Sequence, residues 1–374
     1  MYSTKPISKI ADFKNGKKFN FSEGPIPVYG GNGILTTINE NNAENCVVIG
    51  RVGAQCGSLY YVPNKCWISD NAIVAKELTD CNKFLYYLLK TCALNTRSIG
   101  SGQPLITQGI LNDISARYPN DIVVKRTIEK MLSAFDDKIE KNTEHIVSLT
   151  LLIQTLYQSW FSDFNYPTAT NEMRESETLH KEVPKGWKEM KFGEFLAPHS
   201  EKIGDVEAPI YSTTNNGIAL RDEKFNKNLS KSQKNNKKIV KDDLIFGLSR
   251  EILNFGVVTE EIGSVSPVYQ IFKIDQTVFL PFLLELEIRI NMPNYMDILQ
   301  LGAREGQGIS KDYLLNKYIL VPDMEVQKRF AEIYTVIKNK IAKLKEENVV
   351  LAEIRDTLLP KLMNGELPVE EGEE

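Results

Sequence analysis

Residues 128–160, IEKMLSAFDDKIEKNTEHIVSLTLLIQTLYQSW, carry the most regular hydrophobic pattern in the chain and decide its architecture. Apolar residues recur in alternating steps of four and three, which predicts one long helix with a seam that packs against another helix. At 1.5 Å per residue the stretch spans about 50 Å. The one polar seam residue, Asn142, is expected to fix the register of the pairing. The seam consists of Ile128, Leu132, Phe135, Ile139, Asn142, Ile146, Leu149, Ile153, Leu156 and Trp160.

A second periodic segment, residues 323–365, lies near the C-terminus. Its first seam position is apolar in five successive heptads, at Phe330, Ile337, Leu344, Leu351 and Leu358. Its second position is assigned to Val326, Ile333 and Ile354, with Ile341 and Leu362 compensating one residue later where Lys340 and Glu347 interrupt the pattern. Two such helices in one chain favour an intramolecular antiparallel coiled coil. The alternative is that both helices dimerise with another chain.

The sequence that precedes each helix is repeated. The turn Asn32-Gly33-Ile34 recurs 184 positions later as Asn216-Gly217-Ile218, and Ile10 and Phe13 are matched with Phe192 and Phe195. Closer to the helices, Tyr118-Pro119 is matched with Val321-Pro322 and Lys125-Arg126 with Lys328-Arg329, both 203 positions apart, so the second copy contains insertions. A period this long indicates duplicated domains rather than a solenoid, whose units run to roughly 20 to 50 residues.

Each copy has the pattern of a mixed α/β domain, in which short β-branched or aromatic runs between glycines and prolines precede a helix. The predicted strands are 46–49, 59–62 and 72–75 in the first copy and 244–246, 257–259 and 268–273 in the second, and the predicted helices are 83–94 and 282–290. We therefore predict an α+β protein with two duplicated domains joined by two long helices. Its predicted segments are a first domain at 1–118, a spacer helix at 119–165, a linker at 166–186, a second domain at 187–322, a second spacer helix at 323–365 and an acidic tail at 366–374.

Composition and cysteine usage indicate an ordinary globular protein. The chain has 374 residues, of which 42% are apolar and 25% charged, and no apolar run approaches the roughly 18 residues that suggest a membrane span. The N-terminus lacks the apolar core of a signal peptide, and all five cysteines lie in the first domain without Cys-x-x-Cys spacing. These features predict a cytoplasmic protein whose cysteines are small buried hydrophobic residues rather than metal ligands.

The net charge of −4 averages over an uneven distribution. Five glutamates fall in the last nine residues, so the rest of the chain carries about +1. Residues 224–241 contain lysines and no acid, and we expect phosphate contacts from Lys231, Lys234, Lys237 and Lys238. A weaker basic stretch covers residues 1–22. The alternative for the lysine run is a solvated loop without a partner.

Two similar domains on a stiff spacer suit a target with two separated features, such as duplex DNA. A spacer of about 50 Å corresponds to roughly 15 base pairs. Arginine, glutamine and asparagine in glycine-rich loops can approach base edges closely. The base-reading candidates are Arg51, Gln55, Arg97, Ser101 and Gln103 in the first domain and Arg250, Arg304 and Gln307 in the second. The alternative is that these glycines only permit tight turns.

Catalytic constellations are scarce. The three histidines are His145, His180 and His199, of which the first two fall on the predicted spacer helix and linker. The chain has no Gly-x-x-x-x-Gly-Lys-Ser/Thr loop, no Gly-x-Gly-x-x-Gly and no His-Glu-x-x-His. Asp136-Asp137 and Asp242-Asp243 could serve a metal-dependent nuclease, although adjacent acids at such places are usually solvated. We therefore assign no catalytic or metal-binding residue and expect a chain that is not itself an enzyme.

The sequence resembles the specificity subunits of type I restriction-modification enzymes over nearly its whole length. Residues 125–139, with Trp160-Phe161 and Asp163-Phe164, resemble the family's central helical region, and Pro184-Lys185-Gly186-Trp187 resembles the start of its second recognition domain. Residues 358–366, LLPKLMNGE, resemble its distal helical end and are the most specific match.

This resemblance implies two target-recognition domains that each read one part of a bipartite DNA site, with the helix pair as a ruler. It also implies two methyltransferase subunits, which use S-adenosylmethionine to methylate a flipped adenine, and motor-nuclease subunits that use ATP and Mg²⁺. None of these cofactors is expected on this chain. The competing interpretations are a stand-alone DNA methyltransferase or nuclease, and a coiled-coil scaffold that does not bind DNA.

Overall fold

The computed structural model describes residues 2–100, 102–170, 172–221, 233–249, 252–299 and 308–369. The chain forms two compact units, of which the first comprises Met1–Ile146 and Lys343–Glu374 and the second Val147–Ala342. The long helices α3 (Ile122–Tyr157) and α7 (Met324–Met363) each contribute residues to both units. Across the described ranges, no helix is both long enough and apolar enough to cross a membrane.

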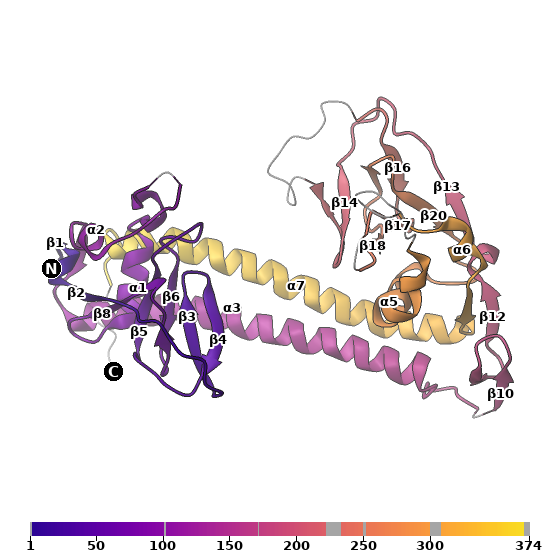
Figure 1. The fold of residues 1–374 in the computed structure, drawn as a ribbon, viewed down its shortest axis with the longest axis horizontal. Coiled ribbons are helices and arrows are strands. Elements are labelled where there is room, and N and C mark those ends of the chain that lie inside the picture. Colours follow the sequence, from indigo (N-terminus) through magenta and orange to yellow (C-terminus); the bar gives the residue numbers. More distant parts are fainter. Residues whose placement is uncertain are drawn as a thin grey trace. The chain divides into compact units, whose positions relative to one another are not determined.

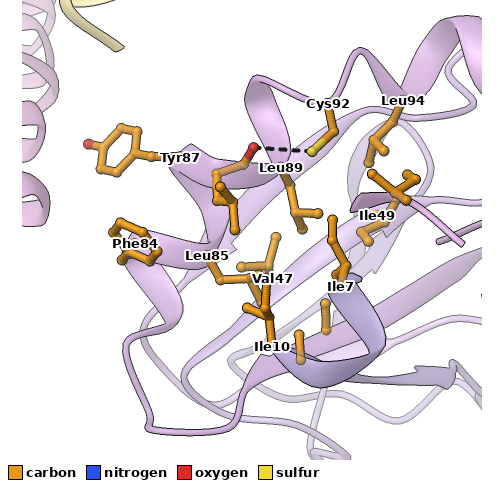
Figure 2. Packing of buried hydrophobic residues seen from close by; sticks show 14 of the residues in the cluster. Ile7, Ile10, Val47, Ile49, Phe84, Leu85, Tyr87, Leu89, Cys92 and Leu94 are labelled. Carbon is orange, nitrogen blue, oxygen red and sulfur yellow. Dashed lines mark hydrogen bonds between the residues drawn. The ribbon is translucent and has the colours of Figure 1, made fainter. Parts of the chain in front are cut away.

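The first unit is built on a four-stranded antiparallel sheet (Figure 1). Its order is β2 (Ala11–Asn15), β8 (Ala72–Glu77), β5 (Cys46–Gly50) and β6 (Leu59–Val62). The central strand β5 is buried on both faces, since Val47 and Ile49 join the main core and Val48 joins a smaller cluster. Helix α1 (Asn82–Lys90) packs its apolar side, including Phe84 and Leu85, against the main core (Figure 2).

Shorter elements complete the first unit. β1 (Tyr2–Pro6) pairs with β9 (Ser115–Pro119), and β3 (Ile26–Gly30) lies between β4 (Gly33–Ile38) and β7 (Trp67–Ile68). A short helix, α2 (Gln108–Asn112), precedes β9. All five cysteines are buried and free of disulfides, as predicted for small hydrophobic side chains.

Helix α1 is shorter than predicted. The sequence pattern placed its end at residue 94, but the helix ends at Lys90. Ala93 adopts the left-handed conformation with φ of 47°, which an α-helix cannot accommodate. Residues 94–97 then form a separate 3-10 turn, η2 (Leu94–Arg97). The loop that follows therefore begins from a fixed turn rather than from the helix itself.

The second unit repeats this plan and confirms the duplication. The strand order β13 (Leu196–His199), β20 (Gln270–Ile274), β17 (Leu244–Phe246), β18 (Phe255–Val257) matches that of the first sheet, and β12 (Lys188–Lys191) pairs with β21 (Tyr318–Val321) as β1 does with β9. Helix α5 (Pro281–Ile290) corresponds to α1, and the hairpin of β14 (Tyr211–Thr214) and β15 (Gly217–Leu220) corresponds to β3–β4. The unit also has the strand pair β16 (Lys237–Val240) and β19 (Ile262–Val265), and its helix α6 (Lys311–Asn316), which follows the cap Ser310 and precedes β21, corresponds to α2.

Two predicted strands of the second unit are displaced. The strand expected at 257–259 is β18 at Phe255–Val257, and the bonds from Val258 N to Asp243 O and from Asp242 N to Val258 O, each 2.9 Å, extend its pairing with β17 by one residue. The strand expected from residue 268 starts at Gln270, because the amide of Tyr269 bonds to Ser266 O in a turn. The hydrophobic run alone did not reveal where the turn before β20 ends.

The structure corrects two of the sequence matches between the copies. The first 3-10 turn of each copy begins at Ile7 and at Phe192, and the amides of these residues bond to Ile114 O and Lys317 O respectively. Phe192 thus corresponds to Ile7 and not to Ile10. The long helices begin after the capping residues Asp121 and Asp323, whose Oδ1 atoms accept from Val123 N and Glu325 N, each at 2.8 Å.

These caps show that the helical parts are 202 positions apart rather than 203. The true counterpart of Lys125 is therefore Gln327, not Lys328. Before the caps the shift is 203, as the bonds to Ile114 O and Lys317 O show, so the match of Tyr118-Pro119 with Val321-Pro322 is confirmed; the second copy has one residue fewer between Pro322 and its cap.

The segment expected as a linker contains regular structure. Residues of β10 (Met173–Ser176) and β11 (Lys181–Pro184) form an antiparallel hairpin. Before it, α3 ends in a π turn, Gln158–Ser162, in which Trp160 and Phe161 are buried. Polar composition had suggested an open chain here, but the hairpin is closed by backbone hydrogen bonds that composition does not report.

Within each unit the two long helices pack against each other. In the first unit Asp136 pairs with Arg355, and Asn142 Nδ2 donates to Glu347 Oε2 at 3.0 Å and Asn348 Oδ1 at 2.9 Å. The residue numbers of the partners on α7 decrease as the residue numbers on α3 increase, so the two helices pair in antiparallel orientation. The pairing is intramolecular, as predicted. In the second unit, the rings of Trp160 and Phe161 lie 5.6 and 5.0 Å from that of Phe330.

The seam of α3 is confirmed. Of the residues predicted for the second seam position of α7, Val326, Ile341 and Leu362 are buried, but Ile333 and Ile354 were wrong by one residue. Every predicted seam residue of α3 is buried or half-buried, including Asn142 at 1% exposure. On α7 the predicted Ile333 and Ile354 are exposed, whereas the residues that follow each of them, Tyr334 and Arg355, are half-buried. The second position is occupied by Gln327, Tyr334, Ile341, Asn348, Arg355 and Leu362.

Candidate nucleic-acid interface

Two loops of the first unit that carry the predicted base-reading residues lie side by side. Gly53 N donates to Pro104 O at 3.0 Å, and Ile106 N donates to Arg51 O at 2.9 Å. Bridges between Val52 and Leu105 and between Ile99 and Leu105 continue the contact. Arg51 and Gln55 on one loop are thereby brought next to the loop that carries Gln103. We call this pair of loops, residues 51–57 and 98–105, the paired loops.

The polar side chains of the paired loops differ in how freely they can reach a ligand. Gln55 and Gln103 are exposed, and so is Arg97, which precedes the second loop. The Nε of Arg97 donates to Cys92 O at 2.8 Å, which anchors the guanidinium near the end of α1. These three residues can present amide and guanidinium donors to base edges in the way that major-groove readout requires. Their contact with DNA stays a prediction.

Arg51 is the most constrained of the candidates. It is half-buried, and its Nη1 lies 3.5 Å from Asp70 O. Its Nε is buried, and among the described residues it has no hydrogen-bond partner. A guanidinium held this way can offer only part of its five donors to a ligand. We expect Arg51 to support the shape of the paired loops as much as to read bases.

Two glycines of this region have different structural roles. A Cβ on Gly50 would lie 2.5 Å from Gln55 O and 2.4 Å from Ser58 Oγ, so glycine is required where the loop packs on its own backbone. A Cβ on Gly53 would meet nothing within 4 Å, but its φ of +80° favours glycine. The interpretation that the glycines permit tight turns therefore accounts for both positions.

The second unit has the same framework around its corresponding loops. The bridge between Leu299 and Ile309 corresponds to that between Ile99 and Leu105, and Gln270 Nε2 donates to Ile309 O at 2.7 Å. Within the same region Asn254 N bonds to Ser249 Oγ at 2.7 Å. The predicted readers Arg250, Arg304 and Gln307 lie outside the described residues, as do Ser101 of the first unit and Lys231 of the lysine run.

The remaining lysines of the run have partners within the protein. Lys234 pairs with Asp205, and Lys238 Nζ lies 3.2 Å from Glu201 Oε1. Lys237 on β16 is half-buried and donates to Tyr269 O at 2.6 Å, and burial lowers the pKa of its ammonium group. Each of these partners reduces the charge or the freedom available for a phosphate. The sequence could not show this, because Asp205 and Glu201 are distant in the chain.

The acidic pairs that might have served a nuclease have structural partners. Asp136 accepts from Tyr87 OH at 2.5 Å and pairs with Arg355, and Asp137 lies 3.3 Å from Lys83 Nζ. Asp243 is buried, which raises its pKa, and it accepts from Val240 N at 2.9 Å. Over the residues described, no three His, Cys, Asp or Glu side chains gather as a metal site would require.

Comparison with known proteins gives concordant matches. Residues 2–150 match the family model described as the type I restriction modification DNA specificity domain. The specificity subunit of the type I restriction enzyme MjaIX from Methanocaldococcus jannaschii is 27% identical over 314 residues, which cover 78% of this chain and 70% of the relative. The specificity subunit of the type I restriction enzyme EcoprrI from Escherichia coli is 26% identical over 126 residues, or 33% of this chain and 30% of the relative.

A solved structure has the same fold. The S subunit of a type I restriction-modification system from M. genitalium superposes with a TM-score of 0.61 at 16% identity, covering 97% of this chain and 96% of that chain. At this level of identity the likeness concerns the fold, which includes both units and both long helices.

Proposed function

We propose that the chain is the non-catalytic DNA specificity subunit of a type I restriction-modification system, which reads a bipartite DNA target and positions methyltransferase and restriction subunits on it. The match of residues 2–150 to the family's DNA specificity domain and the 27% identity with a specificity subunit over 314 residues support this proposal. One observation carries this proposal. The four-stranded sheets of the two units share one strand order, and each unit has an isolated β-bridge between its helix α1 or α5 and its last strand, Ile99 with Leu105 and Leu299 with Ile309. Two related readers in one chain suit two half-sites of one duplex.

In this proposal the paired loops read bases, and Lys231, Lys234, Lys237 and Lys238 contact phosphates. Arg97, Gln55 and Gln103 are the exposed donors and acceptors of the first unit, and each can form a bidentate contact with a base pair. Arg250, Arg304 and Gln307 of the second unit, which lie outside the described residues, are proposed to read the other half-site. The chain is proposed to hold no cofactor, and S-adenosylmethionine, ATP and Mg²⁺ are proposed to act on the partner subunits.

Exposed apolar residues on the two long helices support two equivalent docking sites for methyltransferase subunits. Three pairs of exposed residues are 202 positions apart, the same shift that relates the helix caps. In the first unit the residues are Met131, Val349 and Ile354, and in the second they are Ile333, Val147 and Leu152. Apolar side chains that recur on the outside of a helix pair are typical of interaction sites. Their equivalence predicts two copies of one partner.

The number of bound methyltransferase subunits tests the docking part of this proposal. We expect two subunits per wild-type chain, one for the Ile333→Asp or Ile354→Asp variant, and none for the double variant, as measured by native mass spectrometry. The exposed neighbours Glu332 and Glu353 provide matched controls, and their replacement by alanine should leave two subunits bound. Retention of two subunits by the double aspartate variant would place the docking site elsewhere.

The methylation pattern of the reconstituted complex tests the reading part. We expect methylated adenines in one motif of two defined parts separated by a fixed number of undefined bases. The purified chain alone, incubated with labelled S-adenosylmethionine and mixed-sequence DNA, should transfer no methyl group. Transfer by the chain alone would favour the enzyme interpretation, and a complex that methylates without any bipartite motif would contradict the reader.

A further inference from the structure

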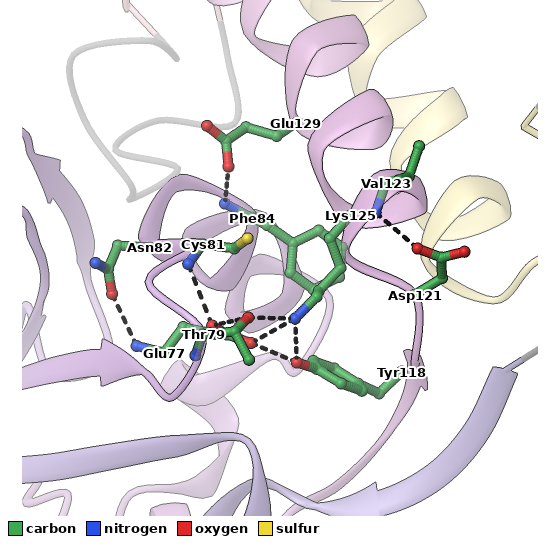
Figure 3. Close-up of polar contacts among 10 residues, drawn as sticks. All are labelled: Glu77, Thr79, Cys81, Asn82, Phe84, Tyr118, Asp121, Val123, Lys125 and Glu129. Atoms are coloured by element: carbon green, nitrogen blue, oxygen red, sulfur yellow. Dashed lines mark hydrogen bonds and ion pairs between the residues drawn. The ribbon is translucent and has the colours of Figure 1, made fainter. Parts of the chain in front are cut away.

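A buried polar cluster fastens the first domain to the start of its long helix (Figure 3). Lys125, the fourth residue of α3, is 1% exposed. Its Nζ donates to Glu77 Oε1 at 3.0 Å, to Tyr118 OH at 2.7 Å and to Thr79 Oγ1 at 2.5 Å. An ammonium group has three donors, and each finds a partner here. We call Lys125 with Glu77, Thr79 and Tyr118 the first lock.

The carboxylate of Glu77 in the first lock also has hydrogen-bond partners for both of its oxygens. Glu77 accepts from Tyr118 OH, from Thr79 N at 2.5 Å and Thr79 Oγ1 at 2.7 Å, and from Cys81 N at 3.2 Å. Burial alone would lower the pKa of Lys125, but the hydrogen bonds with Tyr118 and Glu77 outweigh it and raise this pKa, so the pair stays charged. Such a network defines one geometry, because any rotation of the helix would leave buried charges without partners.

The second unit has a lock at the same place made from different chemistry. Gln327, the fourth residue of α7, is 0% exposed. Its Oε1 accepts from Leu280 N at 2.9 Å, and its Nε2 donates to Val278 O and Pro322 O, each at 2.9 Å. We call Gln327 with these backbone groups the second lock. In both locks the side chain of the long helix bonds to the turn after the second strand of the four-stranded sheet. This turn connects β8 to α1 in the first unit and β20 to α5 in the second.

The position of the locks connects each long helix to a reading loop. In the first unit the turn that bonds to Lys125, residues 77–81, is followed directly by α1. After α1, the chain continues through η2 to the second of the paired loops. One turn beyond Lys125, Glu129 Oε2 accepts from Phe84 N at 3.1 Å and fixes the first turn of α1 to α3 as well. A rotation of the domain about α3 would therefore move Arg97 and Gln103.

We propose that Lys125 and Gln327 are positioning residues that set the angle of each recognition domain on its own helix, and thereby the number of base pairs tolerated between the two half-sites. This inference rests on the proposed function as a reader of a bipartite target. A change of one base pair moves a half-site by about 3.4 Å and turns it by about one tenth of a helical turn. A domain held at one angle cannot follow that turn, whereas a loosened domain can.

The test uses the full chain reconstituted with its methyltransferase subunits and a DNA library in which the spacer length varies. Lys125→Met and Gln327→Met retain side-chain length and remove the hydrogen bonds of the locks. Each variant should keep the base preference of both half-sites, while methylation of sites whose spacer is one base pair longer or shorter rises by about tenfold. A factor of about ten is the loss of affinity that one mismatched base pair typically causes. The exposed lysines Lys130 and Lys328 serve as controls, and their replacement by methionine should leave the spacer distribution unchanged.

The outcomes separate this inference from the proposed function. A wild-type complex without any bipartite motif would contradict the proposed function itself. A wild-type bipartite motif with an unchanged spacer distribution in both lock variants would contradict only the locks. Because Lys125→Met can weaken folding, Lys125→Gln combined with Glu77→Gln provides a neutral version of the first lock. If this neutral variant folds, keeps the wild-type spacer distribution and only methylates less DNA overall, the first lock has a merely structural role.

Discussion

Replacing Lys125 by methionine is the most direct test of the energetics of the first lock. The variant leaves Glu77 as a buried carboxylate without its cation, and the two side chains of the pair are only 2% and 0% exposed. Removing one partner of a buried ion pair typically costs about 3–5 kcal/mol. Glu77 would keep its hydrogen bonds from Tyr118, Thr79 and Cys81, so we expect the lower end of that range, about 3 kcal/mol.

The double variant Lys125→Met with Glu77→Gln should recover most of this loss. No buried charge remains in it, and the residual cost is that of neutral hydrogen bonds that are no longer formed, roughly 1 kcal/mol. Such recovery would show that the penalty of the single variant comes from the uncompensated carboxylate and not from lost packing.

Amide hydrogen exchange measured by mass spectrometry assigns these losses to a unit. Peptides from residues 72–90 and 122–135 should lose protection in the single variant, whereas peptides from the second unit should not. The reasoning would be refuted if the single variant lost less than about 1 kcal/mol, or if the double variant were as unstable as the single one.

Three further predictions follow from the described contacts. Burial alone would raise the pKa of Glu77, but hydrogen bonds from Tyr118, Thr79 and Lys125 lower it below its ordinary value of 4.5. Its stabilising contribution is complete above that pH and is lost as the pH falls through the lower folded pKa, so in acid titrations followed by circular dichroism wild type should lose more stability below pH 4.5 than Glu77→Gln does. Asn142→Leu should cost about 1–3 kcal/mol in urea unfolding, because Glu347 and Asn348 lose a buried donor, and adding Asn348→Leu should restore part of it. Gly50→Ala should lower the melting temperature more than Gly53→Ala, because only the first Cβ meets backbone, and equal effects would contradict the close approach.

The two long helices could be predicted from periodicity, because burial imposes a pattern on the sequence, and the duplication could be predicted from the repeat that precedes each helix. The seam of α3 and strands such as β5 were placed correctly, since their buried positions are almost all apolar. The second seam position of α7 was misplaced in part, because two of its residues, Asn348 and Arg355, are half-buried but polar. Their partners on α3 satisfy them, and a hydropathy pattern cannot reveal a partner 200 residues away.

The candidate site was predictable only in part for the same reason. Glycine-rich loops identified Arg51 and Gln103, and the structure places their loops together. The lysine run was identified by local charge, but the acids that pair with Lys234 and Lys238 lie elsewhere in the chain. The first lock was missed because Lys125 resembles any solvated lysine in sequence. Its one available signal was its place three residues before Ile128, on the buried side of the helix.

The discontinuous make-up of the first unit has a consequence for how the protein is made. Its main core includes Leu359, Leu362 and Met363, which are synthesised after the whole of the second unit, and the second unit is continuous in the chain. At roughly 5–20 residues per second, translation from residue 146 to residue 363 takes about 10 to 40 s. During that time Ile128 and Leu132 lack part of their covering, so the N-terminal domain, although synthesised first, completes its fold second.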